Sequence, residues 1–229
     1  MNPGSVAIIG AGSSGIAAAK ALHERDLDFD CYEASDRVGG NWVFANKNGM
    51  SAAYRDLHIN TSRDRMAFSD FPMADTLPDF PHHKDIAAYF DAYVDHFGFR
   101  DRILFETSVA RAAQLPDGTW ELTDAQGAVR RYDMLLVANG HHWDPRRPEP
   151  AFTGSDVFEG RQLHAHDYRD NDFLRDKDVV VSVQLAAFEH VASGKGRLGP
   201  PRVPVMAVGD EQHVVAPHGA LRILSLIHI

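Results

Sequence analysis

The feature that most constrains the fold is a glycine-rich turn near the start of the chain. Gly10, Gly12 and Gly15 are spaced as GxGxxG, after an apolar run at residues 5–9 and before a stretch of helical spacing at 16–24. In such a turn the first glycine permits a tight bend, the second lets the backbone approach a pyrophosphate, and the third allows close helix–strand packing. The pattern therefore predicts a strand, a turn and a helix whose N-terminus faces phosphate groups.

A carboxylate closes this unit. Glu33 follows Gly15 by eighteen residues, at the end of a second apolar run at residues 28–33. Strand, turn, helix and strand within about thirty residues form a βαβ unit, and the acidic residue is suited to accept hydrogen bonds from ribose hydroxyls. A carboxylate there disfavours a 2′-phosphate, so the first site fits FAD or NAD better than NADP. Ser13 and Ser14 open the predicted helix and complete the expected binding turn; a glycine turn without a ligand is the weaker alternative.

A second glycine pair favours FAD over NAD. Gly39 and Gly40 follow Glu33 closely and are themselves followed by Asn41 and Trp42. In NAD dehydrogenases the chain usually continues here into another helix, whereas paired glycines bring backbone close to another group. Taken alone, this segment would be a simple turn with a core tryptophan. Beside the first glycine turn, we expect Gly40, Asn41 and Trp42 to contact the cofactor.

The rest of the chain indicates an α/β protein with two domains. Residues 39–81 are irregular but rich in aromatic side chains, which favours an ordered, buried excursion. The pattern predicts a helix at 84–97, a strand at 103–105, a three-stranded meander at 109–132 and a buried strand at 134–138. A proline-rich linker follows, and a further strand begins at 178. We expect a Rossmann-like FAD/NAD(P)-binding domain with a β-meander insertion at 1–150, and the start of a second nucleotide-binding domain at 151–229.

Composition excludes several classes of protein. The 229 residues carry a formal net charge of −9, whereas a nucleic-acid-binding protein would usually present a basic face. There is no apolar run long enough to cross a bilayer, and the first residues lack the pattern of a secretory signal. The single cysteine, Cys31, fits a reducing compartment and lies in a predicted buried strand, where an inert thiol is expected. We expect a cytoplasmic protein with no membrane segment and no nucleic-acid partner.

Histidine pairs invite a zinc interpretation that the spacing does not support. His82 and His83 are adjacent, as are His141 and His142, and His164 and His166 are two residues apart. None of these histidines has the helical i, i+4 spacing or the clustered ligands of a metal site. Histidines in loops or at the surface are expected instead, and no metal is predicted.

Several segments resemble the flavin-containing monooxygenase family. The resemblance rests on residues 33–42, 57–62 and 68–72, and above all on the spacing Phe158-x-Gly160-x-x-x-His164-x-x-x-Tyr168. This spacing matches the family fingerprint FxGxxxHxxxY/F. Related Baeyer–Villiger monooxygenases usually carry tryptophan at the last position, so Tyr168 favours the oxidisers of amines and sulfides. The resemblance extends from about residue 6 to residue 181.

The resemblance implies a mechanism in which the protein supplies orientation and excludes water while the cofactor supplies the chemistry. NADPH would reduce FAD, the flavin would capture O₂ as a C4a-hydroperoxide, and an amine nitrogen or sulfide sulfur would take the distal oxygen. It also implies that Asn60 lies at the flavin ring as the catalytic residue with Thr61 beside it, that Val109 offers backbone groups to the adenine, and that Gly140 belongs to the turn that closes on the flavin. His164 would be a structural pivot between domains.

The second half departs from the family. A nicotinamide-binding domain needs a second GxGxxG after the strand that begins near residue 178, but Ser182 and Gln184 replace its two leading glycines. Residues 192–218 show no periodicity, and residues 224–229 look like a translated sequencing adapter. We therefore expect a truncated, frame-shifted fragment. Three functions remain open: an N- or S-monooxygenase in the complete protein, a Baeyer–Villiger ketone monooxygenase, and an FAD-binding module without turnover.

Overall fold

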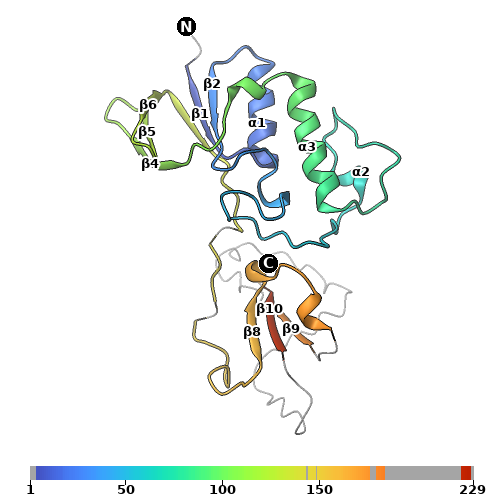
Figure 1. Ribbon diagram of the computed structural model, residues 1–229. Helices are drawn as coiled ribbons and strands as arrows, with labels where there is room; N and C mark the ends of the chain where they lie inside the picture. Colours follow the sequence, from blue (N-terminus) through green and yellow to red (C-terminus); the bar gives the residue numbers. More distant parts are fainter. Residues whose placement is uncertain (1–3, 143, 148, 176–178, 184–222, 228–229) are drawn as a thin grey trace, which may run out of the picture. The chain divides into compact units, whose positions relative to one another are not determined.

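A computed structural model describes residues 4–142, 144–147, 149–175, 179–183 and 223–227 (Figure 1). The chain separates into two compact units, Met1–Asp144 and Pro145–Ile229, and each is described by itself. The domain boundary expected at residue 150 stays a prediction. None of the helices within the described ranges combines the length and apolar character needed to cross a membrane.

A parallel sheet forms the centre of the first unit. Its strands are β1 (Val6–Ile9), β2 (Phe29–Tyr32), β3 (Ile103–Leu104) and β7 (Met134–Val137), in the order β3-β2-β1-β7. All three strand pairs are parallel, and β1 pairs with β2 on one side and with β7 on the other. Helix α1 (Ser13–His23) connects β1 to β2, so the predicted βαβ unit and the α/β class are confirmed.

Alternate residues of the strands serve two different cores, as the two-residue period of a strand requires. The larger core contains Val6 and Ile8 of β1 and Phe29 and Cys31 of β2. Helices α1 and α3 (His83–Phe97) complete it. The apolar stripe predicted for the helix at residues 84–97, which is α3, is buried at five positions: Ile86, Tyr89, Phe90, Tyr93 and Val94. The helix ends at Phe97, and the following Gly98 has a φ of +75°, the left-handed conformation that glycine favours at a helix C-terminus.

The predicted meander packs against the opposite face of the sheet. It consists of β4 (Val109–Gln114), β5 (Trp120–Asp124) and β6 (Val129–Tyr132), which pair antiparallel in the order β4-β5-β6 (Figure 1). Ala7 and Tyr32 from the sheet pack with Leu122 and Tyr132 from the meander. The sheet is thus covered by helices on one face and by the meander on the other.

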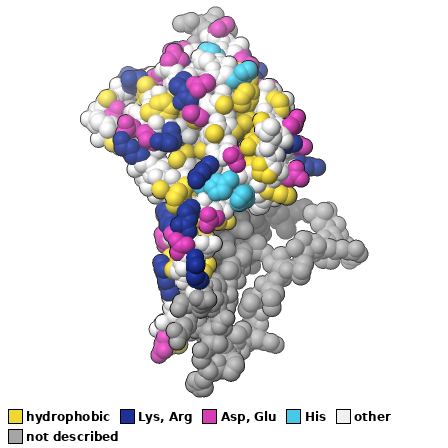
Figure 2. Space-filling model, turned by 45° about the vertical axis from the view of Figure 1, so that its right-hand side comes forward, with side chains coloured by type: hydrophobic (Ala, Val, Ile, Leu, Met, Phe, Trp, Pro, Cys, Tyr) yellow, Lys and Arg dark blue, Asp and Glu magenta, His cyan; other side chains and the backbone are white. Residues whose placement is uncertain are grey.

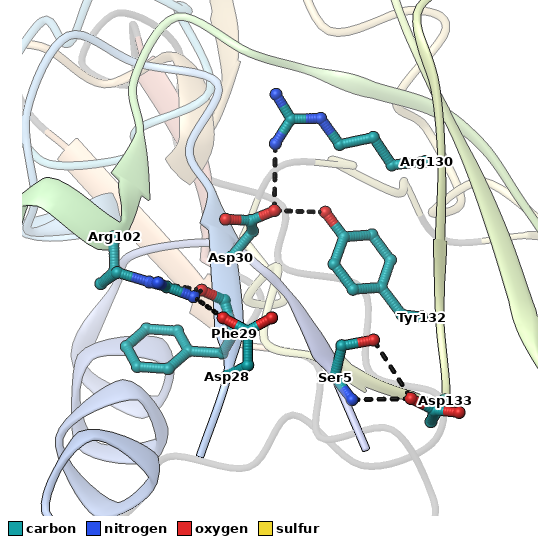
Figure 3. Close-up of polar contacts among 8 residues, drawn as sticks. All are labelled: Ser5, Asp28, Phe29, Asp30, Arg102, Arg130, Tyr132 and Asp133. Carbon is teal, nitrogen blue, oxygen red and sulfur yellow. Dashed lines mark hydrogen bonds and ion pairs between the residues drawn. The ribbon is translucent and has the colours of Figure 1, made fainter. Parts of the chain in front are cut away.

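Polar contacts join the meander to the sheet at one point, drawn in Figure 3. The Tyr132 hydroxyl donates to Asp30 Oδ2 at 2.6 Å, and its oxygen lies 2.7 Å from the Tyr32 hydroxyl. Because the Tyr132 proton is directed at the carboxylate, Tyr32 is the donor in the second contact. Arg130 pairs with the same carboxylate oxygen at 3.0 Å. Arg102, the last residue of η2 (Arg100–Arg102), donates from Nε to the Phe29 carbonyl of β2 at 2.7 Å.

The excursion between β2 and α3 is ordered, as its aromatic residues predicted. It contains the 3₁₀ turn η1 (Gly40–Trp42) and the short helix α2 (Arg63–Met66). Phe68 and Phe71 pack against Tyr89 and Tyr93 of α3, and the Tyr89 hydroxyl donates to the Phe71 carbonyl at 2.6 Å. On the face seen in Figure 2, acidic and basic side chains are interspersed over the first unit.

One expectation about burial is wrong. Residues 134–138 were expected to form a buried strand, and β7 does form there, but it lies at the edge of the described sheet. Met134, Leu136 and Val137 are 49%, 40% and 64% exposed. An apolar run of this kind predicts a strand from its composition, whereas its burial depends on which other elements pack against it.

The second unit contains a separate parallel sheet. Its strands are β8 (Arg161–His164), β9 (Val179–Val183) and β10 (Ile223–Ile227), in the order β8-β10-β9, and two 3₁₀ turns, η3 (Ala165–Asp167) and η4 (Asp172–Leu174), follow β8. The strand expected from residue 178 corresponds to β9. Residues 224–227, part of the segment that looks like a translated sequencing adapter, lie in β10, the central strand of this sheet. Gln184 and residues 192–218, on which other expectations fall, lie outside the described residues.

Candidate functional site

The first glycine turn lies at the carboxyl end of β1, where the sheet order changes direction. β1 leads through α1 to β2 on one side and pairs with β7 on the other, and open α/β sheets usually bind their ligands at such a switch point. Gly10 has a φ of +101°, and its N–H donates to the Tyr32 carbonyl at 2.7 Å. A Cβ on Gly10 would lie only 2.5 Å from the Ala138 carbonyl oxygen, so the turn is packed tightly between β2 and the end of β7.

Gly15 and Gly12 have different structural reasons to be glycine. A Cβ on Gly15 would lie 1.8 Å from the Gly10 carbonyl oxygen, which makes this glycine necessary for the helix to start so close to the turn. Gly12 is the N-cap of α1, and a Cβ there would be 3.9 Å from Gly40 Cα, an ordinary contact. Ile16 donates the N–H bond that closes the first helical turn, to the Gly12 carbonyl at 3.0 Å. The backbone N–H groups of Ser13 and Ser14 precede that bond, as expected at a helix N-terminus that can receive an anion.

Glu33 is buried and holds the turn in place. Its side chain is 5% exposed; Oε2 accepts the Ala11 N–H at 2.8 Å and Oε1 accepts the Ser35 N–H at 2.7 Å. Each carboxylate oxygen can accept a further hydrogen bond, which leaves capacity for ribose hydroxyls. The sequence predicted the ligand-facing role of Glu33 but not this second one, in which the carboxylate fixes both the glycine turn and the chain that leaves β2.

The second glycine pair packs directly on the first turn. Gly39 and Gly40 have φ values of +121° and +53°, and the Gly39 N–H donates to the Ala11 carbonyl at 3.1 Å. A Cβ on Gly40 would lie 3.2 Å from Gly12 Cα. The two glycine segments, separated by nearly thirty residues, therefore bring bare backbone together beside Glu33.

Asn41 and Trp42 continue from this contact into the excursion. Asn41 Oδ1 accepts the Ala52 N–H at 2.7 Å, and the Asn41 carbonyl accepts the Ser51 hydroxyl at 2.8 Å. Trp42 is half-buried against the larger core, and its carbonyl oxygen lies 3.2 Å from His83 Nδ1. In this geometry Asn41 organises the loop through its carbonyl oxygens, and its amide nitrogen is the group suited to donate to a ligand.

The remaining residues expected at the site occupy three other places. Asn60 and Thr61 are exposed and lie between Ile59, whose N–H donates to the Pro81 carbonyl at 3.0 Å, and α2. Val109 starts β4 and packs at the edge of the meander core. Gly140 has a φ of +72° and lies two residues beyond Ala138, the residue that touches Gly10. The contacts that join Gly10, Gly12, Glu33 and Gly40 do not include these four residues.

The fingerprint lies in the second unit, where His164 is 8% exposed. Its Nδ1 accepts the His166 N–H at 3.0 Å, so the ring carries its proton on Nε2 and donates it to the Arg146 carbonyl at 3.1 Å. With both nitrogens bonded to backbone, His164 fastens β8 to the chain before it. That geometry fits the structural role expected for His164, while its action as a pivot between domains stays a prediction.

Two histidines differ from the surface positions expected for them. His83 and His164 are buried, at 2% and 8% exposure. Burial lowers the pKa of His83, and the nearby His82 and Lys84 act in the same direction. Within the described ranges, no three His, Cys, Asp or Glu side chains are grouped as a metal site would require. Cys31 is fully buried, and burial raises its pKa to about 12. Such a thiol is unreactive, as the sequence led us to expect.

A cavity of about 50 Å³ lies within the second unit, between Arg147, Phe152, Ser155, Gln162 and His164. Ligand pockets usually measure about 300–1,000 Å³. This cavity is therefore too small for a dinucleotide, and the glycine turns of the first unit remain the candidate site.

Comparison with known proteins places this geometry in a family context. Residues 4–192 match the family model described as FMO-like, flavin-binding monooxygenase-like. Flavin-containing monooxygenase 5 of Oryctolagus cuniculus is 37% identical over 185 residues, which cover 77% of this chain and 35% of the relative. The chain thus spans about a third of the length of the curated relative.

Solved structures agree with the family match. The S-allyl-L-cysteine S-oxygenase of Allium sativum has a TM-score of 0.69 at 28% identity, covering 79% of this chain and 45% of its own. A cyclohexanone monooxygenase in its open form has a TM-score of 0.60 at 27% identity, covering 81% of this chain and 35% of its own.

Proposed function

Because the chain belongs to the flavin-binding monooxygenase family, we propose that its first unit binds FAD and that the complete protein uses FAD and NADPH to oxygenate amine nitrogen or sulfide sulfur with O₂. The observation that carries the proposal is the contact between two glycine segments beside a buried carboxylate. Gly12 and Gly40 approach with no side chains between them, and Glu33 accepts hydrogen bonds from the backbone of the turn.

Each part of the site has a role in this proposal. The pyrophosphate lies against Gly10, Gly12 and the N-terminus of α1, where Ser13, Ser14 and Gly15 offer backbone N–H groups. Glu33 accepts hydrogen bonds from the adenosine ribose, because each of its oxygens has a further acceptor site. The remaining contacts are assigned by the family resemblance: Gly40, Asn41 and Trp42 beside the cofactor, Val109 at the adenine, Asn60 and Thr61 at the flavin ring, and Gly140 in the turn that closes the site.

The bound flavin supplies the activation of O₂, and the chain supplies orientation and a water-poor environment. An amide is suited to the position proposed for Asn60, since it both donates and accepts hydrogen bonds and adds no charge beside the reacting oxygen. We expect Asn60→Asp to retain FAD and to lose oxygenated product in the complete protein. The measurement is product yield per NADPH consumed, and equal yields from Asn60→Asp and its parent would contradict the assignment.

The substrate class rests on Tyr168 and on the structural neighbours. Tyr168 matches the fingerprint of amine and sulfide oxidisers, and one structural neighbour is named as an S-oxygenase. Another neighbour of similar identity is named as a cyclohexanone monooxygenase, which keeps Baeyer–Villiger oxidation of ketones as the second candidate. Comparing turnover of a dialkyl sulfide with turnover of a cyclic ketone decides between them, and preferential turnover of the ketone would overturn the proposal.

For the 229-residue chain itself, an FAD-binding module without turnover is the competing proposal. Ser182 in β9 stands where a nicotinamide-binding turn would carry its first glycine, so retention of FAD without NADPH consumption would support the module. The buried, unreactive Cys31 is compatible with a reducing compartment, and we propose a cytoplasmic location on that ground.

A further inference from the structure

His83 is a buried imidazole to which the proposed function assigns no part. It is the first residue of α3 and is 2% exposed. Its Nδ1 lies 3.2 Å from the Trp42 carbonyl oxygen, and its Nε2 lies 3.1 Å from the Arg55 carbonyl oxygen. A single ring thus connects two backbone positions of the excursion with the helix that packs beneath it.

The two carbonyls belong to separate segments of the excursion, its first arm at residues 40–42 and its returning arm at residues 55–60. Trp42 ends η1, the turn that begins at Gly40 and packs on Gly12. Arg55 lies five residues before Asn60 on the returning arm. The backbone of His83 holds that arm as well, because its N–H donates to the Leu57 carbonyl at 2.8 Å. His83 is therefore the residue at which the glycine turn and the segment of Asn60 meet.

The imidazole is held in this orientation by its neighbours. His82 caps α3, accepting the Lys84 N–H at 3.2 Å on Nδ1 while its own N–H donates to Asp85. The rings of His82 and His83 lie 4.3 Å apart, and the Phe44 ring lies 5.8 Å from His83 on another part of the excursion. A side chain fixed in this way is suited to set the distance between two loops rather than to exchange with solvent.

The charge state of the ring makes the connection selective. Burial and the adjacent His82 lower the pKa of His83, which favours the neutral ring with one N–H to donate. A neutral imidazole between two carbonyl oxygens donates to one of them at a time. The tautomer of His83 thus decides which arm of the excursion is hydrogen-bonded.

We propose that His83 is a positioning residue of the cofactor site, which fixes the Gly40–Trp42 turn relative to the segment of Asn60. The proposal rests on the proposed FAD function, because the two arms it joins carry the flavin-facing residues. Without the ring hydrogen bond, α3 holds the Leu57 segment only through the backbone N–H of His83, and the two arms can separate. We therefore expect weaker FAD binding and an altered environment of the bound flavin.

The test compares His83→Phe, which keeps an aromatic ring but has no hydrogen-bonding group, with His83→Asn, whose amide NH₂ can donate to a carbonyl oxygen. The matched control is His58→Phe, a change to the exposed ring that meets the His82 ring edge to face, with the ring centroids 5.0 Å apart. For each protein, FAD affinity is measured by quenching of flavin fluorescence, thermal stability without cofactor by circular dichroism, and the flavin environment by visible circular dichroism at saturating FAD.

We expect His83→Phe to weaken FAD binding about tenfold, the effect of roughly one hydrogen bond, and to change the visible dichroism of the bound flavin. His83→Asn restores most of both, and His58→Phe leaves both at the level of the parent protein. If His83→Phe binds FAD as tightly as the parent protein and shows the same visible dichroism, while only its melting temperature falls, then the role of His83 is purely structural. That result would overturn the inference. If His83→Phe does not fold, parent-like flavin dichroism and affinity in His83→Ala overturn it instead. Absence of FAD binding by the parent protein is a different result, which refutes the proposed function itself.

Discussion

The two glycines of the first turn make a matched pair of perturbations, because one faces the protein and the other faces the proposed ligand. In Gly15→Ala the new Cβ would lie 1.8 Å from the Gly10 carbonyl oxygen. In Gly12→Ala it would lie 3.9 Å from Gly40 Cα, with a φ of −75° that any L-residue adopts. The first change should therefore damage folding, and the second should damage binding.

The size of the first effect follows from the geometry. Real Cβ contacts are essentially never shorter than 3.0 Å, so the helix and the turn must separate by at least 1.2 Å, the difference between 3.0 and 1.8 Å. Such overpacking costs about 1–3 kcal/mol, and this contact with rigid backbone belongs at the upper end. Replacing a helical glycine by alanine by itself stabilises the folded state by roughly 0.5–1 kcal/mol, which offsets part of this cost. The net loss is about 2 kcal/mol, or about 4–8 °C in melting temperature for a chain of this size.

Urea unfolding followed by circular dichroism measures the first effect, and fluorescence titration with FAD measures the second. We expect Gly15→Ala to lower the unfolding free energy by about 2 kcal/mol. Gly12→Ala should remain within about 0.5 kcal/mol of the parent but bind FAD at least about tenfold more weakly, since a methyl group replaces a close backbone approach. Equal stability of Gly15→Ala and the parent protein would refute the packing argument, and unchanged FAD affinity in Gly12→Ala would refute the assignment of the turn to the pyrophosphate.

Three further predictions concern single side chains. Tyr132→Phe removes the hydroxyl that donates to Asp30 at 2.6 Å, so unfolding should require about 1.5 kcal/mol less; a stability equal to that of the parent would mean that Arg130 and Tyr32 satisfy the carboxylate alone. Cys31, with its pKa raised to about 12, should resist a thiol reagent at pH 8 in the native protein and react in urea, and rapid native labelling would contradict its burial. Because the folded-state pKa of His83 lies below the ordinary value of 6.5, the unfolded chain takes up the proton first, so stability should fall as pH decreases below about 6.5. The slope should be smaller in His83→Asn, and an identical slope would assign the effect to other groups.

The first βαβ unit could be predicted because its signals are local. Gly10 and Gly15 are required by contacts within a few residues of the same turn, and Glu33 ends the next strand. The direct contact between Gly12 and Gly40 was not predictable in the same way, although the glycine pair suggested that backbone approached something. The group that Gly40 approaches in the structure is the first turn itself.

The burial of side chains was harder to predict because it depends on distant elements. His83 belongs to a pair that resembles ordinary surface histidines, yet α3 and the excursion enclose it. A usable signal was the position of the pair just after Pro81, with Asp85 at the third helical residue and an amphipathic stretch beyond. For β7 the reverse holds, because an apolar sequence alone predicted burial that the described sheet does not provide.

The most direct test of the central claim is a calorimetric titration of the purified chain with FAD, NAD⁺ and NADP⁺, with Gly12→Ala as the control. Because the Glu33 side chain is buried beside the turn, where an acidic residue disfavours a 2′-phosphate, we predict that FAD binds with one site per chain and that NADP⁺ does not compete for it. A folded protein that shows no heat of binding with FAD, or that binds NADP⁺ at this turn in preference to FAD, would contradict the account.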